Sequence, residues 1–326
     1  MINQRLFDHY SINTNKNLEI KKRCARPFDT ILIDKQGSCY ACECTAWLPQ
    51  SIGNLQVSSL EEIIGSATHK ELQNSIVDGS YRYCNASQCS YIKANKFYEA
   101  EKQNIKYLRL AIDNSCNLRC PSCRTQKIFF SRGKELKKML KLADKILMYL
   151  SKTNDAVNVH IGSDGDPFAS LVYRYFMRNV PQHKNHTYTL MTNALLLKKQ
   201  YKHTKSVFNN LTELQISIDG ACKDTYEKLR LGGNWEQLND NLKFISEVMT
   251  FNVCLHMVVQ NDNWAEIPMM LDVADEYNFN SVHFNRIEDW NTGIDMPKQN
   301  FDQTITFKKM IESVKAHPKF RTSILV

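Results

Sequence analysis

Apolar residues in the later two thirds of the chain follow two alternating patterns. Short apolar runs, typical of buried strands, occupy residues 108–112, 157–162, 188–193, 213–219, 252–259 and 281–287. Between them, apolar residues recur at helical spacing, most clearly over residues 134–151, and residues 304–316 predict a closing helix. Strands that alternate with helices predict βα units around a parallel sheet.

The first hundred residues contain shorter elements. Residues 30–33 and 38–41 predict two strands, and the Asp-Lys-Gln-Gly between them has the composition of a hairpin turn. Ser59 and Glu62 have the spacing of a capping box, which predicts the start of a helix. Residues 93–106, rich in lysine, glutamate and asparagine, predict a helix with a short linker. We therefore expect two domains, residues 1–103 and 104–326.

Eleven cysteines and a net charge of +8 limit which classes of protein this chain can belong to. The start of the chain lacks the apolar core of a signal peptide, and no apolar run approaches the ~20 residues of a membrane span. We expect a reducing, cytoplasmic setting low in oxygen, in which cysteines bind metal rather than form disulfides. The lysines are mostly paired, as in Lys137-Lys138 and Lys308-Lys309, which favours solvated faces over a nucleic-acid interface and leaves a modest attraction for anionic substrates.

Three cysteines with the spacing C-x3-C-x2-C follow the first predicted strand of the second domain: Cys116, Cys120 and Cys123. Three thiolates on one loop can bind three irons of a [4Fe–4S] cluster and leave the fourth iron open. The alternatives are a structural zinc site or three unrelated thiols, although a structural zinc ion would require a fourth ligand that this loop does not supply. The arrangement resembles the signature of the radical S-adenosylmethionine (SAM) enzymes, in which the open iron binds the amino and carboxylate groups of SAM.

The loops after the next predicted strands resemble further elements of that superfamily. Gly165-Asp166-Pro167 is similar to its Gly-Gly-Glu-Pro element, with aspartate in place of glutamate. Thr192-Asn193 resembles its Thr-Asn-Gly stretch, although Ala194 occupies the usual glycine position.

The fourth predicted strand ends in Ser-Ile-Asp-Gly, and an arginine follows, as in the Ser-x-Asp-Gly…Arg pattern. The resemblance implies a partial (β/α)6 barrel. It also implies that SAM is bound by Gly165, Asp166, Thr192, Asn193, Ser217 and Arg230. Taken singly, each of these residues could instead be structural, as a turn, an interior polar residue or an exposed charge.

The cysteines of the first domain also follow a pattern. Cys24, Gly37 and Cys42 form C-x12-G-x4-C, which resembles the opening of a SPASM or twitch domain, the auxiliary-cluster module of many radical SAM enzymes. This implies a small α+β module with one auxiliary [4Fe–4S] cluster bound by Cys24, Cys42, Cys84 and Cys89. Cys44 is the substitute ligand, and Cys39 is expected in the hairpin core. The module usually follows the barrel, whereas here it precedes it. Structural zinc is the alternative metal.

The resemblance implies an enzyme with oxidoreductase- or isomerase-type radical chemistry. SAM would be cleaved reductively to a 5′-deoxyadenosyl radical that takes hydrogen from a C–H bond of the substrate. Electrons would come from a donor such as flavodoxin or ferredoxin. We expect a small-molecule or sugar-like substrate, because residues 1–20 are too few for a leader-peptide recognition domain; a short peptide is the alternative. A non-catalytic iron–sulfur or zinc protein is a further alternative, and the sequence identifies no catalytic acid or base.

Overall fold

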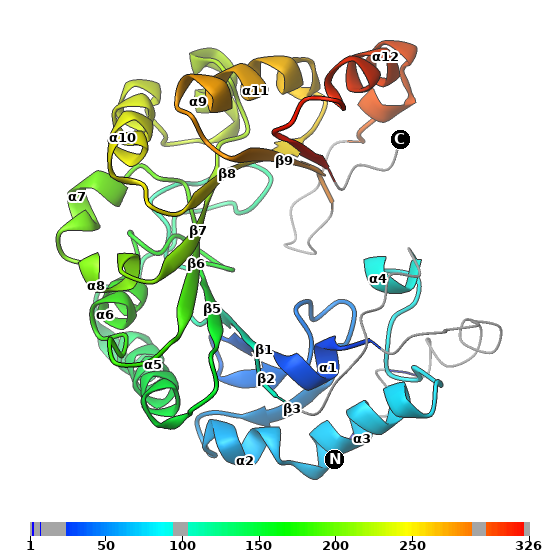
Figure 1. Cartoon of the computed structure of the whole chain (residues 1–326), viewed down its shortest axis with the longest axis vertical. Coiled ribbons are helices and arrows are strands. Elements are labelled where there is room, and N and C mark those ends of the chain that lie inside the picture. Colours follow the sequence, from blue (N-terminus) through cyan, green and yellow to red (C-terminus); the bar gives the residue numbers. More distant parts are fainter. Residues whose placement is uncertain (1, 3–6, 8–23, 94–103, 289–297, 323–326) are drawn as a thin grey trace. The chain divides into compact units, whose positions relative to one another are not determined.

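The computed structural model describes residues 2, 7, 24–93, 104–288 and 298–322 (Figure 1). The chain forms two compact units. The first comprises Met1–Asp113, Ser131–Asp164 and Tyr175–Thr187. The second comprises Asn114–Phe130, Gly165–Arg174 and Tyr188–Val326. The expected domain boundary after residue 103, and most of the helix expected at 93–106, lie outside the described residues, so both stay predictions.

The strands of the first unit form a mixed sheet in the order β3-β2-β1-β4-β5. The predicted hairpin is confirmed: β1 (Thr30–Asp34) pairs antiparallel with β2 (Ser38–Tyr40), which pairs antiparallel with β3 (Ser51–Asn54). On its other side β1 pairs in parallel with β4 (Tyr107–Ala111), and β4 pairs in parallel with β5 (Asn158–Ile161). The pairing of β1 with β4 was not predicted, because a hydrophobic pattern does not specify which strands become neighbours.

Two helices of the first unit, α2 and α5, match predictions from the sequence. Helix α1 (Arg26–Asp29) precedes the hairpin, and α2 (Leu60–Ile64) begins with the capping box, since Ser59 and Glu62 each accept the other's backbone N–H. Helices α2 and α3 (Ala67–Val77) contact β3, and α4 is short (Ser90–Lys93) (Figure 1). The predicted amphipathic helix is α5 (Gly133–Lys152).

Among its described residues, the second unit has five parallel strands in consecutive order. They are β6 (Thr187–Thr192), β7 (Leu211–Ser217), β8 (Asn252–Val259), β9 (Ser281–Arg286) and β10 (Phe320–Thr322). The helices are α7 (Leu197–Tyr201), α8 (Lys205–Phe208), α9 (Lys223–Leu229), α10 (Trp235–Val248), α11 (Ile267–Glu276) and α12 (Ile305–Val314). Helices α9, α10 and α11 lie along one side of strands β7–β9 (Figure 1).

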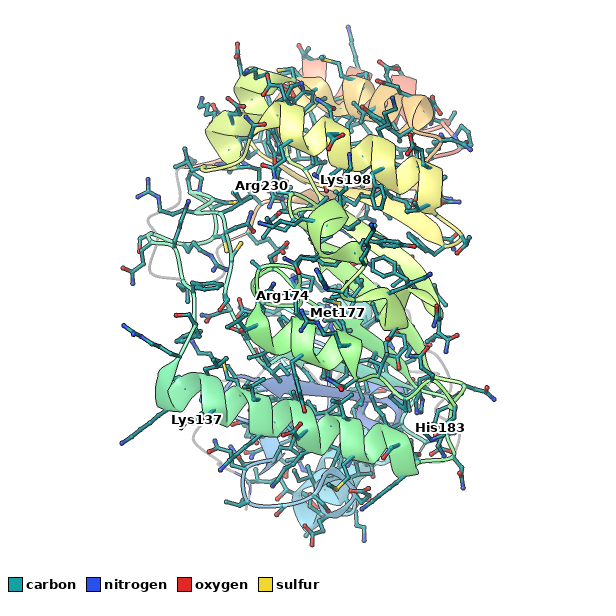
Figure 2. The ribbon with its side chains drawn as sticks, turned by 90° about the vertical axis from the view of Figure 1, so that its left-hand side faces the viewer. Lys137, Arg174, Met177, His183, Lys198 and Arg230 are labelled. Carbon is teal, nitrogen blue, oxygen red and sulfur yellow. The ribbon has the colours of Figure 1, made fainter. Side chains whose placement is uncertain are left out.

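Helix α6 (Leu171–Arg178) follows β5 and shows how the apolar pattern directs burial. Val172, Phe176 and Met177 are completely buried, whereas Arg174 on the same helix is half-buried and donates from Nε to the carbonyl of Ser170 at 3.3 Å (Figure 2). All six strands predicted for the barrel are present, each within two residues of its expected bounds. The predicted closing helix is α12, whereas β10 was not predicted.

The chain is therefore an α/β protein with a partial (β/α)6 barrel, preceded in sequence by a small α+β module. No helix in the described ranges has both the length and the apolar character that crossing a membrane requires.

Candidate cofactor-binding sites

The cysteine loop, residues 114–130, follows β4 and carries Cys116, Cys120 and Cys123. Each of its three sulfurs accepts a hydrogen bond from nitrogen. The donors are Leu118 N to Cys116 Sγ at 3.4 Å, Arg124 Nε to Cys123 Sγ at 3.4 Å and Arg230 Nη1 to Cys120 Sγ at 3.8 Å. Hydrogen bonds to a sulfur favour its charged thiolate form, which is the form that binds metal.

Burial opposes that charge. It raises the pKa of the Cys116 thiol to about 12 and also raises the pKa of Cys120. Without a cation these thiols remain protonated at neutral pH, whereas bound iron would supply the missing positive charge. Three thiols, N–H donors and no fourth cysteine on the loop fit a [4Fe–4S] cluster with one open iron.

Asp166 joins the loop after β5 to the end of β6. Its Oδ1 accepts the backbone N–H groups of Phe168 and Ala169 at 3.0 and 3.1 Å. Its Oδ2 accepts the Thr192 hydroxyl at 2.7 Å and the Asn193 N–H at 2.9 Å. Burial raises the pKa of Asp166, and these hydrogen bonds lower it. Because each oxygen already has two donors, the carboxylate holds two loops together.

Gly165 places this segment directly against the start of the cysteine loop. The N–H of Asp166 donates to the carbonyl of Ser115 at 2.8 Å, immediately before Cys116. Gly165 has φ +76°, and a Cβ there would lie 2.6 Å from the Ser115 oxygen. Both the backbone angle and the close approach therefore require glycine.

Asn193 extends this network to Cys116, one of the predicted cluster ligands. Its Nδ2 donates to Asn117 Oδ1 at 3.0 Å and to Cys116 Sγ at 3.8 Å, and its Oδ1 accepts the Leu195 N–H at 3.1 Å. The next residue, Ala194, has φ +63°, which explains why the superfamily pattern has glycine at this position. Asn193 thus connects the end of β6 with the cysteine loop.

Arg230 (labelled in Figure 2) follows α9 and contacts both the Asp219 carboxylate and the Cys120 sulfur. Its Nε is 2.9 Å from Asp219 Oδ2; the Nε–H makes no hydrogen bond, so this contact is an ion pair. Burial lowers the pKa of Arg230, but the acidic groups around it, Asp219 foremost among them, together outweigh burial and raise the pKa above its usual value. Asp219 is itself fixed at φ +54° and accepts the Val258 N–H at 2.8 Å.

The structure brings together most of the predicted SAM-site residues. Asp166, Thr192, Asn193 and Arg230 are linked by hydrogen bonds to one another or to the cysteine loop, and Gly165 lies directly against that loop. Ser217 ends β7, and its hydroxyl makes no hydrogen bond in the described part of the chain. Asn117 and Asp219 were missed from sequence. A buried arginine requires a counter-ion, and the Ser-Ile-Asp-Gly segment contains one, so Asp219 could have been found.

The four cysteines predicted for the auxiliary cluster come from three segments of the first unit. Cys24 precedes α1, Cys42 follows β2, and Cys84 and Cys89 lie between α3 and α4. All four line one small cavity of about 20 Å³, together with aromatic side chains that include Tyr81 and Tyr91.

The electrostatics of this cavity fit a metal-containing group bound by the four thiols. Burial raises the pKa of Cys24 to about 12 and raises that of Cys84, and the neighbouring thiols raise the pKa of Cys84 further. Four buried or half-buried thiols around one small cavity require a cationic group to ionise. Cys44 does not line the cavity, and Cys39 is buried in the hairpin, where its Sγ donates to the Gly37 carbonyl at 3.7 Å.

Within residues 24–93, 104–288 and 298–322, no three His, Cys, Asp or Glu side chains converge closely enough to bind one metal ion. A tetrahedral zinc site would hold four sulfurs about 2.3 Å from a single ion. The four thiols line one small cavity without converging on a single point.

Family models and solved structures agree with this picture. The model of the radical SAM superfamily matches residues 111–274, and that of the SPASM iron–sulfur cluster-binding domain matches residues 24–90. The predicted order, with the SPASM domain first, is confirmed. The crystal structure of Streptococcus suis SuiB bound to precursor peptide SuiA superposes with a TM-score of 0.50 at 14% identity, over 81% of this chain and 64% of that one. The structure of SuiB bound to S-adenosylmethionine also superposes with a TM-score of 0.50, at 12% identity, over 83% of this chain and 60% of that one.

Curated relatives match over part of their length. A GTP 3′,8-cyclase of Alkaliphilus metalliredigens is 26% identical over 159 residues, 48% of each chain. Another, from Lactiplantibacillus plantarum, is 27% identical over 176 residues, 52% of this chain and 51% of the relative. The chain thus spans about half the length of these relatives. Its two matched domains imply a [4Fe–4S] cluster with SAM and an auxiliary [4Fe–4S] cluster. Since the superfamily model covers half of the chain, the protein belongs to the radical SAM superfamily.

Proposed function

We propose that this protein cleaves SAM reductively and uses the resulting radical to take hydrogen from a C–H bond of a small-molecule or carbohydrate-like substrate. The observation that carries the proposal is the cysteine loop, where three thiols accept N–H donors and face a network that ends in Arg230. When bound, the cluster supplies the electron that divides SAM into methionine and a 5′-deoxyadenosyl radical.

The residues around the cysteine loop position the cofactors. Gly165 lets the loop after β5 approach the cysteine loop, and Asp166 fastens that loop to Thr192 and Asn193. Because the Asp166 carboxylate is already saturated, its part in SAM binding is to hold neighbouring backbone carbonyls in place. Arg230, fixed by Asp219, places positive charge beside Cys120, where the SAM carboxylate would bind.

The auxiliary site has a separate role in the proposal. A cluster bound by Cys24, Cys42, Cys84 and Cys89 would accept or relay an electron from the substrate radical, or bind the substrate through an open iron. The four thiols around one cavity support this assignment.

Two considerations support a small substrate. The curated relatives are named for a reaction of GTP, which is a small molecule. The chain also carries a net charge of +8, which attracts anionic substrates. A short ribosomal peptide is the alternative substrate, so a substrate screen should include both classes.

The proposed setting is a reducing cytoplasm with a flavodoxin- or ferredoxin-like electron donor. All eleven cysteines, each of which lies in the described ranges, are free thiols rather than disulfides. Free thiols are typical of reducing compartments.

Anaerobic reconstitution with iron and sulfide tests the proposal. Wild-type protein should convert SAM to 5′-deoxyadenosine and methionine when dithionite is present. Cys120→Ala should abolish this conversion, whereas Cys222→Ala, which removes a half-buried thiol outside the cysteine loop, should retain it. Equal activity of Cys120→Ala and wild type would refute the proposal.

Iron content separates the two clusters. Two four-iron clusters give about eight irons per chain. Replacing Cys116, Cys120 and Cys123 together by alanine should leave about half of that iron and abolish SAM cleavage. Replacing Cys84 and Cys89 should also remove about half, but leave unproductive SAM cleavage. If the triple variant retains no iron and one zinc per chain is found, the auxiliary site binds zinc and the electron-relay role is wrong.

A further inference from the structure

A second pocket lies on the first unit, lined by none of the residues assigned to the clusters or to SAM. Its walls are helix α5 and the loop after β3, and its volume is about 450 Å³. Small-molecule sites usually have volumes of roughly 300–1,000 Å³. The pocket therefore has the size of a ligand site.

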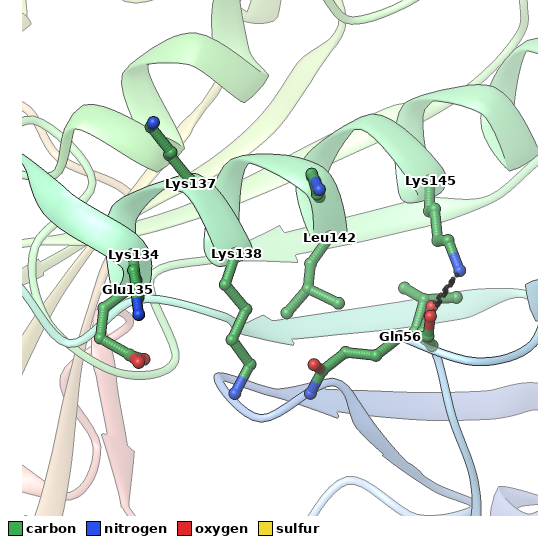
Figure 3. A pocket seen from close by; sticks show the side chains of 9 residues that line it. Gln56, Lys134, Glu135, Lys137, Lys138, Leu142 and Lys145 are labelled. Atoms are coloured by element: carbon green, nitrogen blue, oxygen red, sulfur yellow. Dashed lines mark hydrogen bonds between the residues drawn. The ribbon is translucent and has the colours of Figure 1, made fainter.

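Lysines dominate the lining. Five of them come from α5 at helical spacing, against a single carboxylate, Glu135: Lys134, Lys137, Lys138, Lys141 and Lys145. From the first to the last they extend about 16 Å along the helix axis. Figure 3 shows Lys138 and Lys145 directed toward the loop that holds Gln56, whereas Lys137 extends from the opposite side of the helix.

One of the five lysines has a structural role. The Lys145 ammonium donates to the backbone carbonyls of Leu55 at 2.6 Å, Gln56 at 3.2 Å and Ser58 at 3.4 Å. It thereby fixes the loop that forms the opposite wall, so the pocket does not depend on a ligand for its shape.

The other four lysines make no ion pair with any described residue. Lysines three or four positions apart on a helix repel one another, which destabilises the helix. Lys134 and Lys138, and Lys138 and Lys141, are such pairs. The start of α5 adds the positive end of the helix dipole near Lys134. A bound polyanion would relieve this repulsion.

We propose that this pocket binds a small polyphosphate, either free or as the phosphate tail of a nucleotide. Lysine ammonium groups bind phosphate oxygens as point charges and need no fixed fork geometry, so a row of lysines suits a chain of phosphates. The row of lysines matches a linear anion better than a single phosphate. Leu55 and Leu142 supply an apolar floor beside the row.

Equilibrium binding to the reconstituted full chain tests the proposal, with inorganic tripolyphosphate, ATP and a short single-stranded RNA as probes at low salt without magnesium. The test variant is Lys138→Gln/Lys141→Gln. The matched control is Lys308→Gln/Lys309→Gln, which removes the same charge from two exposed positions on α12.

We expect saturable tripolyphosphate binding at one site per chain, weakened about tenfold or more by the test variant, equivalent to about 1.4 kcal/mol, and less than about twofold by the control. Tighter binding of ATP than of tripolyphosphate would assign the site to a nucleotide, and equal binding would assign it to free polyphosphate. The absence of saturable binding, equal weakening by both variants, or tighter binding of RNA than of either small anion would overturn the proposal. Circular dichroism and iron content confirm that both variants fold.

Discussion

Replacing Asp166 by asparagine tests whether this carboxylate fastens the site together. The change keeps the shape of the side chain but puts an NH₂ group in place of one oxygen. In the wild type Oδ1 accepts two backbone N–H groups and Oδ2 accepts the Thr192 hydroxyl and the Asn193 N–H. The NH₂ group must therefore face one of these two pairs of donors.

The structure indicates which pair of donors the new NH₂ group faces. The Thr192 hydroxyl can rotate and accept from the new NH₂ group, whereas the two N–H groups of Phe168 and Ala169 cannot. The amide oxygen should therefore stay on the Oδ1 side, which leaves the Asn193 N–H without an acceptor. A hydrogen bond to a charged acceptor contributes about 1.5–3 kcal/mol, and an unsatisfied buried donor costs a similar amount. The lower desolvation cost of a neutral side chain offsets part of this, so the free energy of unfolding should fall by about 2 kcal/mol.

Urea titration of the anaerobic protein, followed by circular dichroism, measures this change. Asp155→Asn is the control, since it removes the same charge from an exposed position before β5 and should shift the free energy of unfolding by less than about 0.5 kcal/mol. SAM binding by equilibrium dialysis should weaken in Asp166→Asn and not in the control. If Asp166→Asn unfolds like wild type, or if both variants lose equal stability, the carboxylate does not fasten the two loops.

Three further predictions concern a backbone position, an ion pair and a buried histidine. Gly165→Ala should abolish SAM cleavage and lower the thermal stability more than Gly79→Ala does. Both glycines have positive φ, but a Cβ at Gly165 would clash with the Ser115 backbone, whereas one at Gly79 would contact nothing within 4 Å. Equal losses of stability would contradict the steric argument. Asp219→Asn should leave Arg230 without its counter-ion and lower the free energy of unfolding by about 3 kcal/mol in a urea titration. Asp224→Asn, at an exposed position on α9, should leave the free energy of unfolding nearly unchanged, and an equal loss in both variants would contradict the role of the ion pair. His186 accepts a backbone N–H through Nδ1, and burial lowers its pKa, so stability should fall as the pH drops below about 6.5 toward the lowered folded-state pKa. In His186→Gln, urea titrations from pH 7 to 5 should show a smaller loss than wild type, and an unchanged slope would assign the acid sensitivity to other groups.

Much of the fold follows from local pattern. Helix α5 was predictable because its apolar residues recur at helical spacing, and the start of α2 because Ser59 and Glu62 have capping-box spacing. The pairing of β1 with β4 was not predictable, because neighbouring strands in a sheet are selected by tertiary packing. Strand β10 was missed because three residues are too few to show a period.

The candidate site divides in the same way. The cysteines and their spacing are visible in the sequence, as are the residue types at Asp166 and Arg230. Their hydrogen-bond partners are not, because the saturation of Asp166 and the ion pair of Arg230 depend on segments distant in sequence. The row of lysines on α5 is also readable from its spacing, whereas the pocket exists only because the loop after β3 lies opposite it.

The parallel pairing of β1 with β4 makes the two parts of the chain hard to separate genetically. Five residues of β1, Thr30 to Asp34, align with Tyr107 to Ala111 along the edge of β4. A truncation that begins at residue 104 would uncover that edge and its row of unpaired backbone groups. Exposed edges of this kind recruit strands from other molecules and promote aggregation. A shortened barrel should therefore be recovered in inclusion bodies unless another strand replaces β1, so residues 24–93 also act as the cap of the sheet into which they are built.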